Sequence, residues 1–122
     1  MRNNKKILIV DDDIAVIDFF ASFLERFNLE VIKAKNADEA LKFFNLNKPN
    51  LVFLDIQLPD RDGVSVLKDI LEISPKAKVF MLTAKSEKIL QKKAKEIGAF
   101  DYITKPIDLA IFIKKIKRYI EI

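Results

Sequence analysis

Short apolar runs alternate along the chain with longer segments in which apolar residues recur every three or four positions. The short runs predict five strands, and several of them are apolar at every position, which is typical of strands buried on both faces. They cover residues 7–10, 31–34, 51–54, 79–82 and 102–103.

The longer segments predict five helices, of which the first covers about residues 14–27 and the third about residues 63–73. Asn36, Ser86 and Asp108 are the expected N-caps of the second, fourth and fifth helices, and Gly98 suits the end of the fourth. Glu39, three residues after Asn36, completes a capping-box pattern. The side chains expected to face the core are Val16, Phe19, Phe20, Phe23, Leu24 and Phe27; Ala37, Ala40, Leu41 and Phe44; Val64, Leu67, Ile70 and Leu71; Leu90, Ala94 and Ile97; and Leu109, Phe112, Ile113, Ile116 and Ile120.

Strict alternation of strands and helices predicts the α/β class, with a parallel sheet covered by helices on both faces. For five strands we expect the order 2-1-3-4-5 of a doubly wound, flavodoxin-like three-layer sandwich. The 122 residues, half of them hydrophobic, are enough for one domain spanning residues 1–122. No apolar stretch approaches the length of a membrane span and no secretory signal is visible, so we expect a cytoplasmic location without membrane insertion.

The amino-acid composition limits which kinds of catalysis and metal site the chain can support. Cysteine and histidine are both absent, which excludes thiol nucleophiles, imidazole catalysis and metal sites built on either residue. The two glycines are too far apart for a phosphate-binding glycine loop. Residues 85–122 hold ten Lys or Arg against five Asp or Glu, so the C-terminal third is basic although the net charge of the chain is only +4.

Polar residues follow four of the five predicted strands at the edge where ligands of such sheets bind. Carboxylates crowded at that edge repel one another and favour a bound cation. With oxygen ligands alone, Mg²⁺ is the expected ion and Mn²⁺ is possible. A hydroxyl and an ammonium beside the carboxylates favour phosphoryl transfer, with an aspartate as a possible covalent acceptor. The strand-end residues are Asp11, Asp12, Asp13, Asp55, Thr83, Ala84, Thr104, Lys105 and Pro106.

Four segments, ILIVDDD, LVFLDIQLPDRDG, MLTA and YITKP, resemble those of response-regulator receiver domains, the CheY-like phosphoacceptors of two-component signalling. That family spaces its acceptor Asp, a Pro four residues later and a Gly eight residues later, and Asp55, Pro59 and Gly63 fit this spacing. The resemblance extends from Ile7 to the last helix. It implies a signalling switch rather than an enzyme. Such a switch promotes its own phosphorylation and dephosphorylation.

The resemblance also implies roles for single residues on the metal side of the site. Asp55 is the implied phosphoacceptor, which attacks a phosphohistidine of a partner histidine kinase or phosphotransfer protein. Asp12 is the implied direct ligand of Mg²⁺, and Asp11 acts largely through water. Gln57 contributes its backbone carbonyl oxygen to the metal.

On the phosphoryl side, the resemblance implies that the Thr83 hydroxyl and the Ala84 amide bind phosphoryl oxygens and that Lys105 pairs with their charge. Pro106 corresponds to a cis proline that aims Lys105. Tyr102 holds the position of a switch aromatic, which turns inward when Thr83 moves toward the phosphate.

Three alternatives stay open from the sequence. A phosphatase of the haloacid-dehalogenase type would use Asp11 as nucleophile and Asp13 as general acid, but it leaves the spacing around Asp55 unexplained. A non-phosphorylated interaction module would keep the fold without the chemistry. The chain could also be the receiver fragment of a longer DNA-binding regulator.

The fourth helix, the fifth strand and the fifth helix are expected to form a face rich in basic side chains. This basic face favours a downstream partner that is an acidic protein rather than nucleic acid, because no recognition helix is visible. We expect a monomer, with dimerisation through this face left open. The basic face consists of Lys88, Lys92, Lys93, Lys95, Lys114, Lys115, Lys117 and Arg118.

Overall fold

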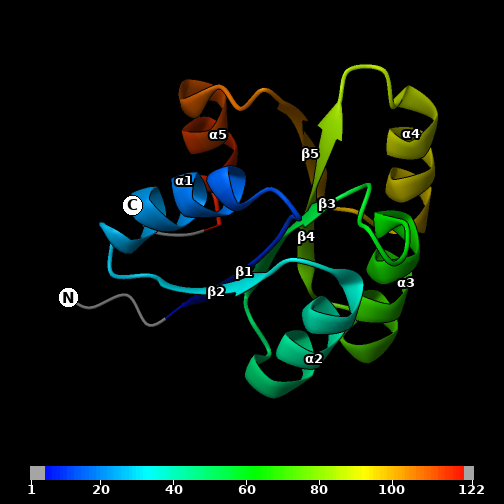
Figure 1. Ribbon diagram of the computed structural model, residues 1–122, viewed down its shortest axis with the longest axis horizontal. Coiled ribbons are helices and arrows are strands. Elements are labelled where there is room, and N and C mark those ends of the chain that lie inside the picture. The colour runs from blue at the N-terminus through cyan, green and yellow to red at the C-terminus, as the bar shows by residue number, and fades with distance from the viewer. Residues whose placement is uncertain (1–4, 120–122) are drawn as a thin grey trace.

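The computed structural model describes residues 5–119, which form a five-stranded sheet between two layers of helices (Figure 1). The strands are β1 (Lys6–Val10), β2 (Glu30–Ala34), β3 (Leu51–Asp55), β4 (Lys78–Ala84) and β5 (Asp101–Lys105). The helices are α1 (Ile14–Glu25), α2 (Ala37–Asn47), α3 (Gly63–Ile73), α4 (Lys88–Ile97) and α5 (Leu109–Ile116). Within residues 5–119, no helix has the length and apolar content needed to cross a bilayer.

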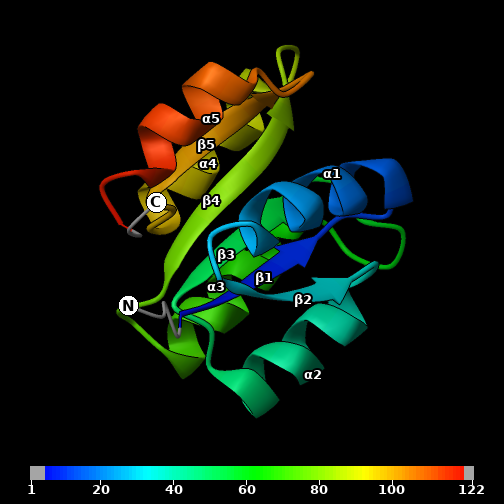
Figure 2. The same ribbon diagram turned by 90° about the vertical axis from the view of Figure 1, so that its left-hand side faces the viewer.

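All strand pairs are parallel, and their order is β2-β1-β3-β4-β5, as the alternation of elements predicts. Helices α1 and α5 cover one face of the sheet, and α2, α3 and α4 cover the other (Figures 1 and 2). The strand order reverses direction next to β1, so the carboxyl ends of β1 and β3 border the crevice in which ligands of such sheets bind.

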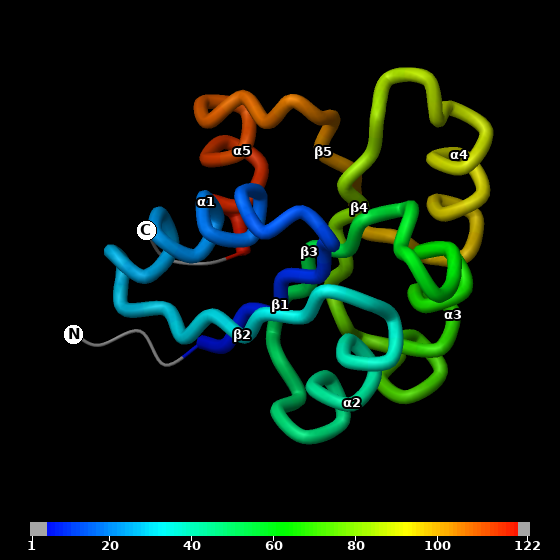
Figure 3. Tube along the Cα trace, viewed as in Figure 1, coloured from blue at the N-terminus to red at the C-terminus, as the bar shows by residue number. Residues whose placement is uncertain are grey.

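The sheet separates two apolar clusters, and the central strands contribute to both. Every residue of β3 is buried, which confirms the prediction of strands covered on both faces. The cluster under α1 and α5 is aromatic: the ring of Phe20 lies 5.3 Å from that of Phe53 and 4.8 Å from that of Phe112. Phe23 of α1 also contacts Phe112 of α5, so these two helices lie side by side, as the trace in Figure 3 shows.

Two helices bury most of the predicted side chains but differ from the prediction at single positions. In α1 the buried residues include Ile17 and Ala21, whereas Phe19 is 41% exposed. The small Ala21 side chain lets α1 approach the sheet on this side, and Phe19 is left at the rim of the layer. Helix α1 ends at Glu25, two residues before the predicted boundary. Leu109, predicted to face the core, is 40% exposed at the first position of α5.

The predicted caps of α2 and α5 are confirmed, since the Asn36 and Asp108 side chains accept hydrogen bonds from the first-turn amides of these helices. Gly98 ends α4 with a φ of 131°, also as expected. Ser86, however, is not the cap of α4. The Glu87 amide donates to the Ala84 carbonyl at 3.1 Å, and this turn delays the start of the helix to Lys88. Ile120, predicted to be part of the core, lies outside the described residues.

Candidate functional site

The carboxyl ends of β1, β3, β4 and β5 bring the predicted polar residues to one edge of the sheet. Residue pairing places Val10 opposite Leu54, Asp55 opposite Leu82 and Ala84 opposite Lys105, so the four strands end within about two residues of one another at this edge. Carboxylate oxygens of Asp11, Asp12 and Asp55 lie within 4.8 Å of one another. The three acidic residues predicted to share a site therefore do so.

The three consecutive aspartates after β1 have different surroundings. Asp11 is fully buried, and its Oδ1 accepts a hydrogen bond from the Asp13 amide at 2.9 Å. Asp12 is exposed beside it. The Asp13 carboxylate accepts from the Ala15 amide at 2.9 Å and caps α1, so it does not belong to the acidic cluster.

Asp55 is 7% exposed at the end of β3. Its Oδ1 accepts from the Gln57 amide at 3.1 Å, and its Oδ2 accepts from Lys105 Nζ at 3.2 Å. Burial, together with the negative charge of Asp11, raises the pKa of Asp55 to about 6, although the contacts with Gln57 and Lys105 act in the opposite direction. A large fraction of Asp55 is thus ionised at neutral pH.

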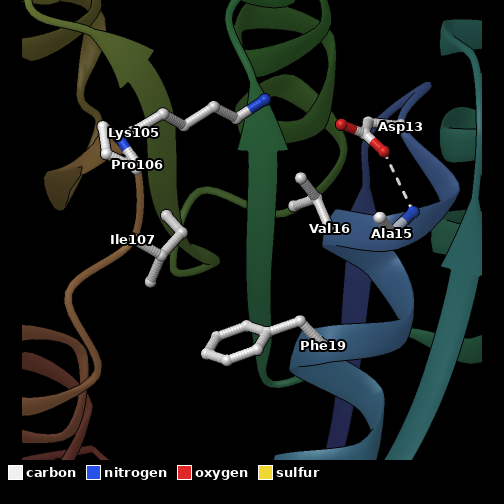
Figure 4. Close-up of a pocket in the computed structure, with 7 residues that line it drawn as sticks. All are labelled: Asp13, Ala15, Val16, Phe19, Lys105, Pro106 and Ile107. Carbon is white, nitrogen blue, oxygen red and sulfur yellow. Dashed lines mark hydrogen bonds between the residues drawn. The ribbon is translucent and has the colours of Figure 1, made fainter.

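Lys105 extends from the end of β5 across the end of β3 (Figure 4), and its ammonium meets the carboxylates of Asp11 and Asp55 there. Its Nζ lies 2.6 Å from Oδ2 of Asp11, closer than to Asp55. Burial lowers the pKa of Lys105, but the hydrogen bonds and charges of the two aspartates outweigh it, so the net pKa is raised above its usual value. The peptide bond between Lys105 and Pro106 is cis, as the resemblance implies.

An apolar hollow of about 540 Å³ lies beside Lys105, between α1 and the segment after β5. Val16 and Phe19 line it from α1, and Pro106 and Ile107 line it from the opposite side (Figure 4). The exposed part of Phe19 thus forms part of the wall of this hollow.

The loop after β3 is held to the rest of the site at several points. Asp60 accepts hydrogen bonds from the amides of Ala37 at 2.8 Å and Asp38 at 3.1 Å, at the start of α2. These amides lower the pKa of Asp60. Gln57 forms an antiparallel bridge with Asp62 within the loop. Sequence reasoning missed Asp60, because an acidic residue that accepts from the amides of a distant helix leaves no local pattern in the sequence.

The predicted glycine and proline of this loop have different surroundings. A Cβ atom on Gly63 would overlap the carbonyl oxygen of Asp55, because the two backbone segments touch there. This contact accounts physically for a glycine eight residues after the predicted acceptor. Pro59 is exposed and lines the hollow around Asp55.

Thr83 and Ala84, at the end of β4, are both hydrogen-bonded by residues of the α4 segment. Thr83 is fully buried, and its hydroxyl accepts from Gln91 Nε2 at 2.7 Å. The same nitrogen is 3.3 Å from the Ala84 carbonyl oxygen. The Ala84 amide donates to the Glu87 carboxylate at 2.7 Å. Neither Glu87 nor Gln91 was predicted as a site residue, although Gln91 is a polar residue one position after the apolar Leu90.

Tyr102 is half-buried on β5, and its carbonyl oxygen accepts from Lys115 Nζ at 2.6 Å. The same ammonium lies 5.0 Å from the centre of the Tyr102 ring. Tyr102 and Gln91 line one hollow next to Thr104, the residue paired with Thr83 across the two strands. Gln91, which donates to the Thr83 hydroxyl, thus also lies beside Tyr102 in this hollow.

The acidic cluster fits a hard divalent cation. Oδ2 of Asp11 is buried and faces the ammonium of Lys105 at 2.6 Å, and a carboxylate oxygen paired in this way keeps a lone pair for a metal ion. Asp12 and Asp55 add carboxylate oxygens on the same side. Oxygen ligands of this kind, with water completing the shell, suit Mg²⁺ and Mn²⁺.

Comparison with known proteins gives the same picture over nearly the whole chain. The family model for the response regulator receiver domain matches residues 7–117. The chain is 42% identical over 103 residues to the alkaline phosphatase synthesis transcriptional regulatory protein PhoP of Bacillus subtilis, which covers 84% of this chain but only 43% of that protein.

Other relatives match over nearly their full length. Sporulation initiation phosphotransferase F of Bacillus subtilis is 31% identical over 117 residues, covering 96% of this chain and 94% of that protein. The crystal structure of a CheY-like response regulator receiver domain protein from Methanospirillum hungatei superposes with a TM-score of 0.88 at 35% identity, covering 93% of this chain and 91% of that one. The chain therefore belongs to the response regulator receiver family, whose members are phosphorylation-controlled switches of two-component signalling.

Proposed function

We propose that Asp55 is the residue that accepts the phosphoryl group in this receiver domain. The observation that carries this assignment is the position of its carboxylate, which lies among Asp11, Asp12 and Lys105 at the crevice edge of the sheet. Receiver domains interact with histidine kinases or phosphotransfer proteins, so the donor is a phosphohistidine on such a protein. Family membership leaves no support for a haloacid-dehalogenase phosphatase using Asp11.

In the proposed step, a carboxylate oxygen of Asp55 attacks the phosphorus atom of the donor. A P–O bond forms and the P–N bond breaks, and the departing imidazole keeps the electron pair. A divalent cation bound by Asp11, Asp12, Asp55 and the Gln57 carbonyl would neutralise charge on the phosphoryl oxygens. The backbone amide of Gln57 orients the Asp55 carboxylate through its hydrogen bond to Oδ1.

The phosphoryl oxygens would then be bound by the Thr83 hydroxyl, the Ala84 amide and Lys105. The positions of these groups support this role, since Ala84 and Lys105 line the same hollow as Asp55. Binding draws Thr83 toward Asp55, and Tyr102 moves into the space next to it. Because hydrolysis of the acyl phosphate uses the same groups, the domain also promotes its own dephosphorylation.

The downstream partner in this proposal is an acidic protein that docks on the basic face. Among the described residues, the ion pairs on this face join Asp101 to Lys95 at 3.9 Å and to Lys115 at 3.4 Å. The other basic side chains of the face have no acidic partner within 4 Å in the described segment and remain available to a partner. A monomer is favoured because a second copy would bring the same positive charge to the interface.

The domain itself spans the chain in this proposal, and the family match to residues 7–117 supports one receiver unit. The chain spans less than half the length of PhoP, and a receiver that is part of a longer regulator is equally compatible with this likeness.

The test is phosphorylation by acetyl phosphate in the presence of Mg²⁺, with the modified residue mapped by mass spectrometry. We expect one phosphoryl group on Asp55, none on the Asp55→Asn variant, and normal labelling of an Asp69→Asn control on the surface of α3. A phosphoryl group on Asp11, or a labelled Asp55→Asn protein, would contradict the assignment.

A further inference from the structure

We propose that the Glu87 carboxylate competes with the phosphoryl group for the backbone amide of Ala84. It accepts the hydrogen bond of that amide before phosphorylation, and the phosphoryl group must displace it. This inference rests on the proposed function, because it assumes that the Ala84 amide binds a phosphoryl oxygen. Glu87 would thus lower the affinity of the site for the phosphoryl group or a mimic of it.

The geometry shows the amide already engaged. Glu87 accepts the Ala84 N–H at 2.7 Å, the distance of a strong hydrogen bond to a charged acceptor. One N–H group makes only one good hydrogen bond, so a phosphoryl oxygen and the Glu87 carboxylate exclude each other there. The competition takes place inside the site, since Glu87, Ala84, Asp55 and Lys105 line one cavity of about 470 Å³.

The position of Glu87 in the chain shows that the contact is made in place of a helix cap. Glu87 is the residue before α4, where a side chain usually accepts from the first amides of the helix, yet it makes no such bond. It reaches back three residues instead, while its own amide donates to the Ala84 carbonyl. Within the described part of the chain no Lys or Arg lies within 4 Å of its carboxylate.

Displacement of Glu87 is favoured once the acceptor is phosphorylated. A phosphoryl group carries nearly two negative charges, which repel the nearby carboxylate in addition to competing for the amide. Gln91 acts differently, because the Thr83 hydroxyl can accept from Gln91 and still donate its own hydrogen to a phosphoryl oxygen. Gln91 therefore follows Thr83, whereas the Glu87 carboxylate has to leave the Ala84 amide.

The test compares Glu87→Gln and Glu87→Ala with wild type, using beryllofluoride with Mg²⁺ as the phosphoryl mimic and NMR titration as the measurement. Loss of a hydrogen bond to a charged competitor should tighten binding to Glu87→Ala by about tenfold. Glu87→Gln, which keeps the shape and an acceptor but not the charge, should be intermediate. Glu96→Ala, which removes an exposed acid from the same helix, should bind like wild type.

A second readout needs no variant that could disturb the fold. In wild-type protein, beryllofluoride should shift the side-chain carboxyl resonance of Glu87 together with the amide resonance of Ala84. Equal or weaker binding to Glu87→Ala, or a Glu87 carboxyl resonance that does not shift, overturns this inference while phosphorylation of Asp55 stands. Failure of the wild type to accept a phosphoryl group on Asp55 overturns the proposed function and this inference with it.

Discussion

The ammonium group of Lys105 lies 2.6 Å from the Asp11 carboxylate, whereas its distance to Asp55 is 3.2 Å. The cation of the site thus pairs most closely with the fully buried acid rather than with the proposed acceptor. Burial of Asp55 and the negative charge of Asp11, which Lys105 offsets only in part, raise the pKa of Asp55 to about 6.

This raised pKa predicts a specific dependence of stability on pH. Between about pH 4 and pH 6 the native protein keeps a proton on Asp55 that the unfolded chain has lost, so the free energy of unfolding falls as pH rises. The expected loss is about 2–3 kcal/mol, from a shift of about two pKa units. Urea denaturation at pH 4.5 and 7 without Mg²⁺ measures it. Asp55→Asn should lack this part of the pH dependence and be at least as stable as wild type at pH 7.

Mg²⁺ should stabilise wild-type protein in thermal melts, because it binds the native state alone. Asp12→Asn should weaken Mg²⁺ binding by at least about tenfold, and by more than Asp11→Asn, since Asp11 is already paired with Lys105. Calorimetric titration checks the order, with Asp18→Asn on the exposed side of α1 as the control. Coincident melts with and without millimolar Mg²⁺ would contradict the metal site, and a larger effect of Asp11→Asn would reverse the assignment of the direct ligand.

Lys105→Ala should still accept a phosphoryl group on Asp55 from acetyl phosphate but should lose the response of the basic face. The nucleophile is intact in this variant, whereas the group that senses the new phosphoryl oxygens is missing. Thr83→Ala should behave in the same way. The measurement is the set of amide shifts in α4, β5 and α5 on beryllofluoride binding, and shifts of wild-type size would refute this division of roles.

Gly63→Ala should lower the free energy of unfolding by about 2–4 kcal/mol and should also slow the phosphorylation of Asp55. The added methyl group overlaps the Asp55 carbonyl oxygen, so the backbone that carries the acceptor must shift. Gly98→Ala is the matched comparison. The φ of 131° at Gly98 also disfavours alanine, but Gly98 lies at the C-terminal end of α4, away from the site. It should destabilise the fold without slowing phosphorylation once native protein is compared at equal concentration.

Charge reversal tests the docking proposal for the basic face. Lys92→Glu with Lys117→Glu should slow association of the activated protein with its partner and reduce the salt dependence of the rate, without altering phosphorylation. Lys95 is left in place, since it pairs with Asp101. Lys42→Glu with Lys68→Glu, exposed on α2 and α3, gives the same charge change elsewhere. Equal slowing by both pairs would indicate an effect of net charge. A dimer of the beryllofluoride-bound protein that persists at physiological salt would contradict the monomer.

The strands and their order follow from the sequence because apolar runs and their alternation with helices are local properties of the chain. The fifth strand was predicted as residues 102–103 only, since its polar ends, Asp101 and Lys105, interrupt the apolar pattern. The cap of α4 was wrong for a related reason. Serine is a better N-cap residue than glutamate, but the turn between Ala84 and Glu87 determines where the helix begins.

The acidic cluster was predictable because each strand end adds one polar residue to a common edge. Its internal pairing was not, since the preference of Lys105 for Asp11 depends on distances of a few tenths of an ångström. Asp60 and Gln91 act on backbone or side chains of another element, and a single sequence carries no signal for such contacts.

The hydrogen bonds that Asp60 accepts from the first amides of α2 have one more consequence. Together with the Gln57–Asp62 bridge and the close contact at Gly63, they fasten the loop after β3 to its neighbours. Within the described residues, the hydrogen bonds of the segment after β4 join it only to α4 itself, through Glu87 and Gln91, and α4 begins without a side-chain cap. The two sides of the site therefore differ in how easily they move. The loop after β3 stays in place when negative charge is added at Asp55, whereas the segment after β4 can shift. A signal generated at the centre should travel toward α4 and leave α2 where it is.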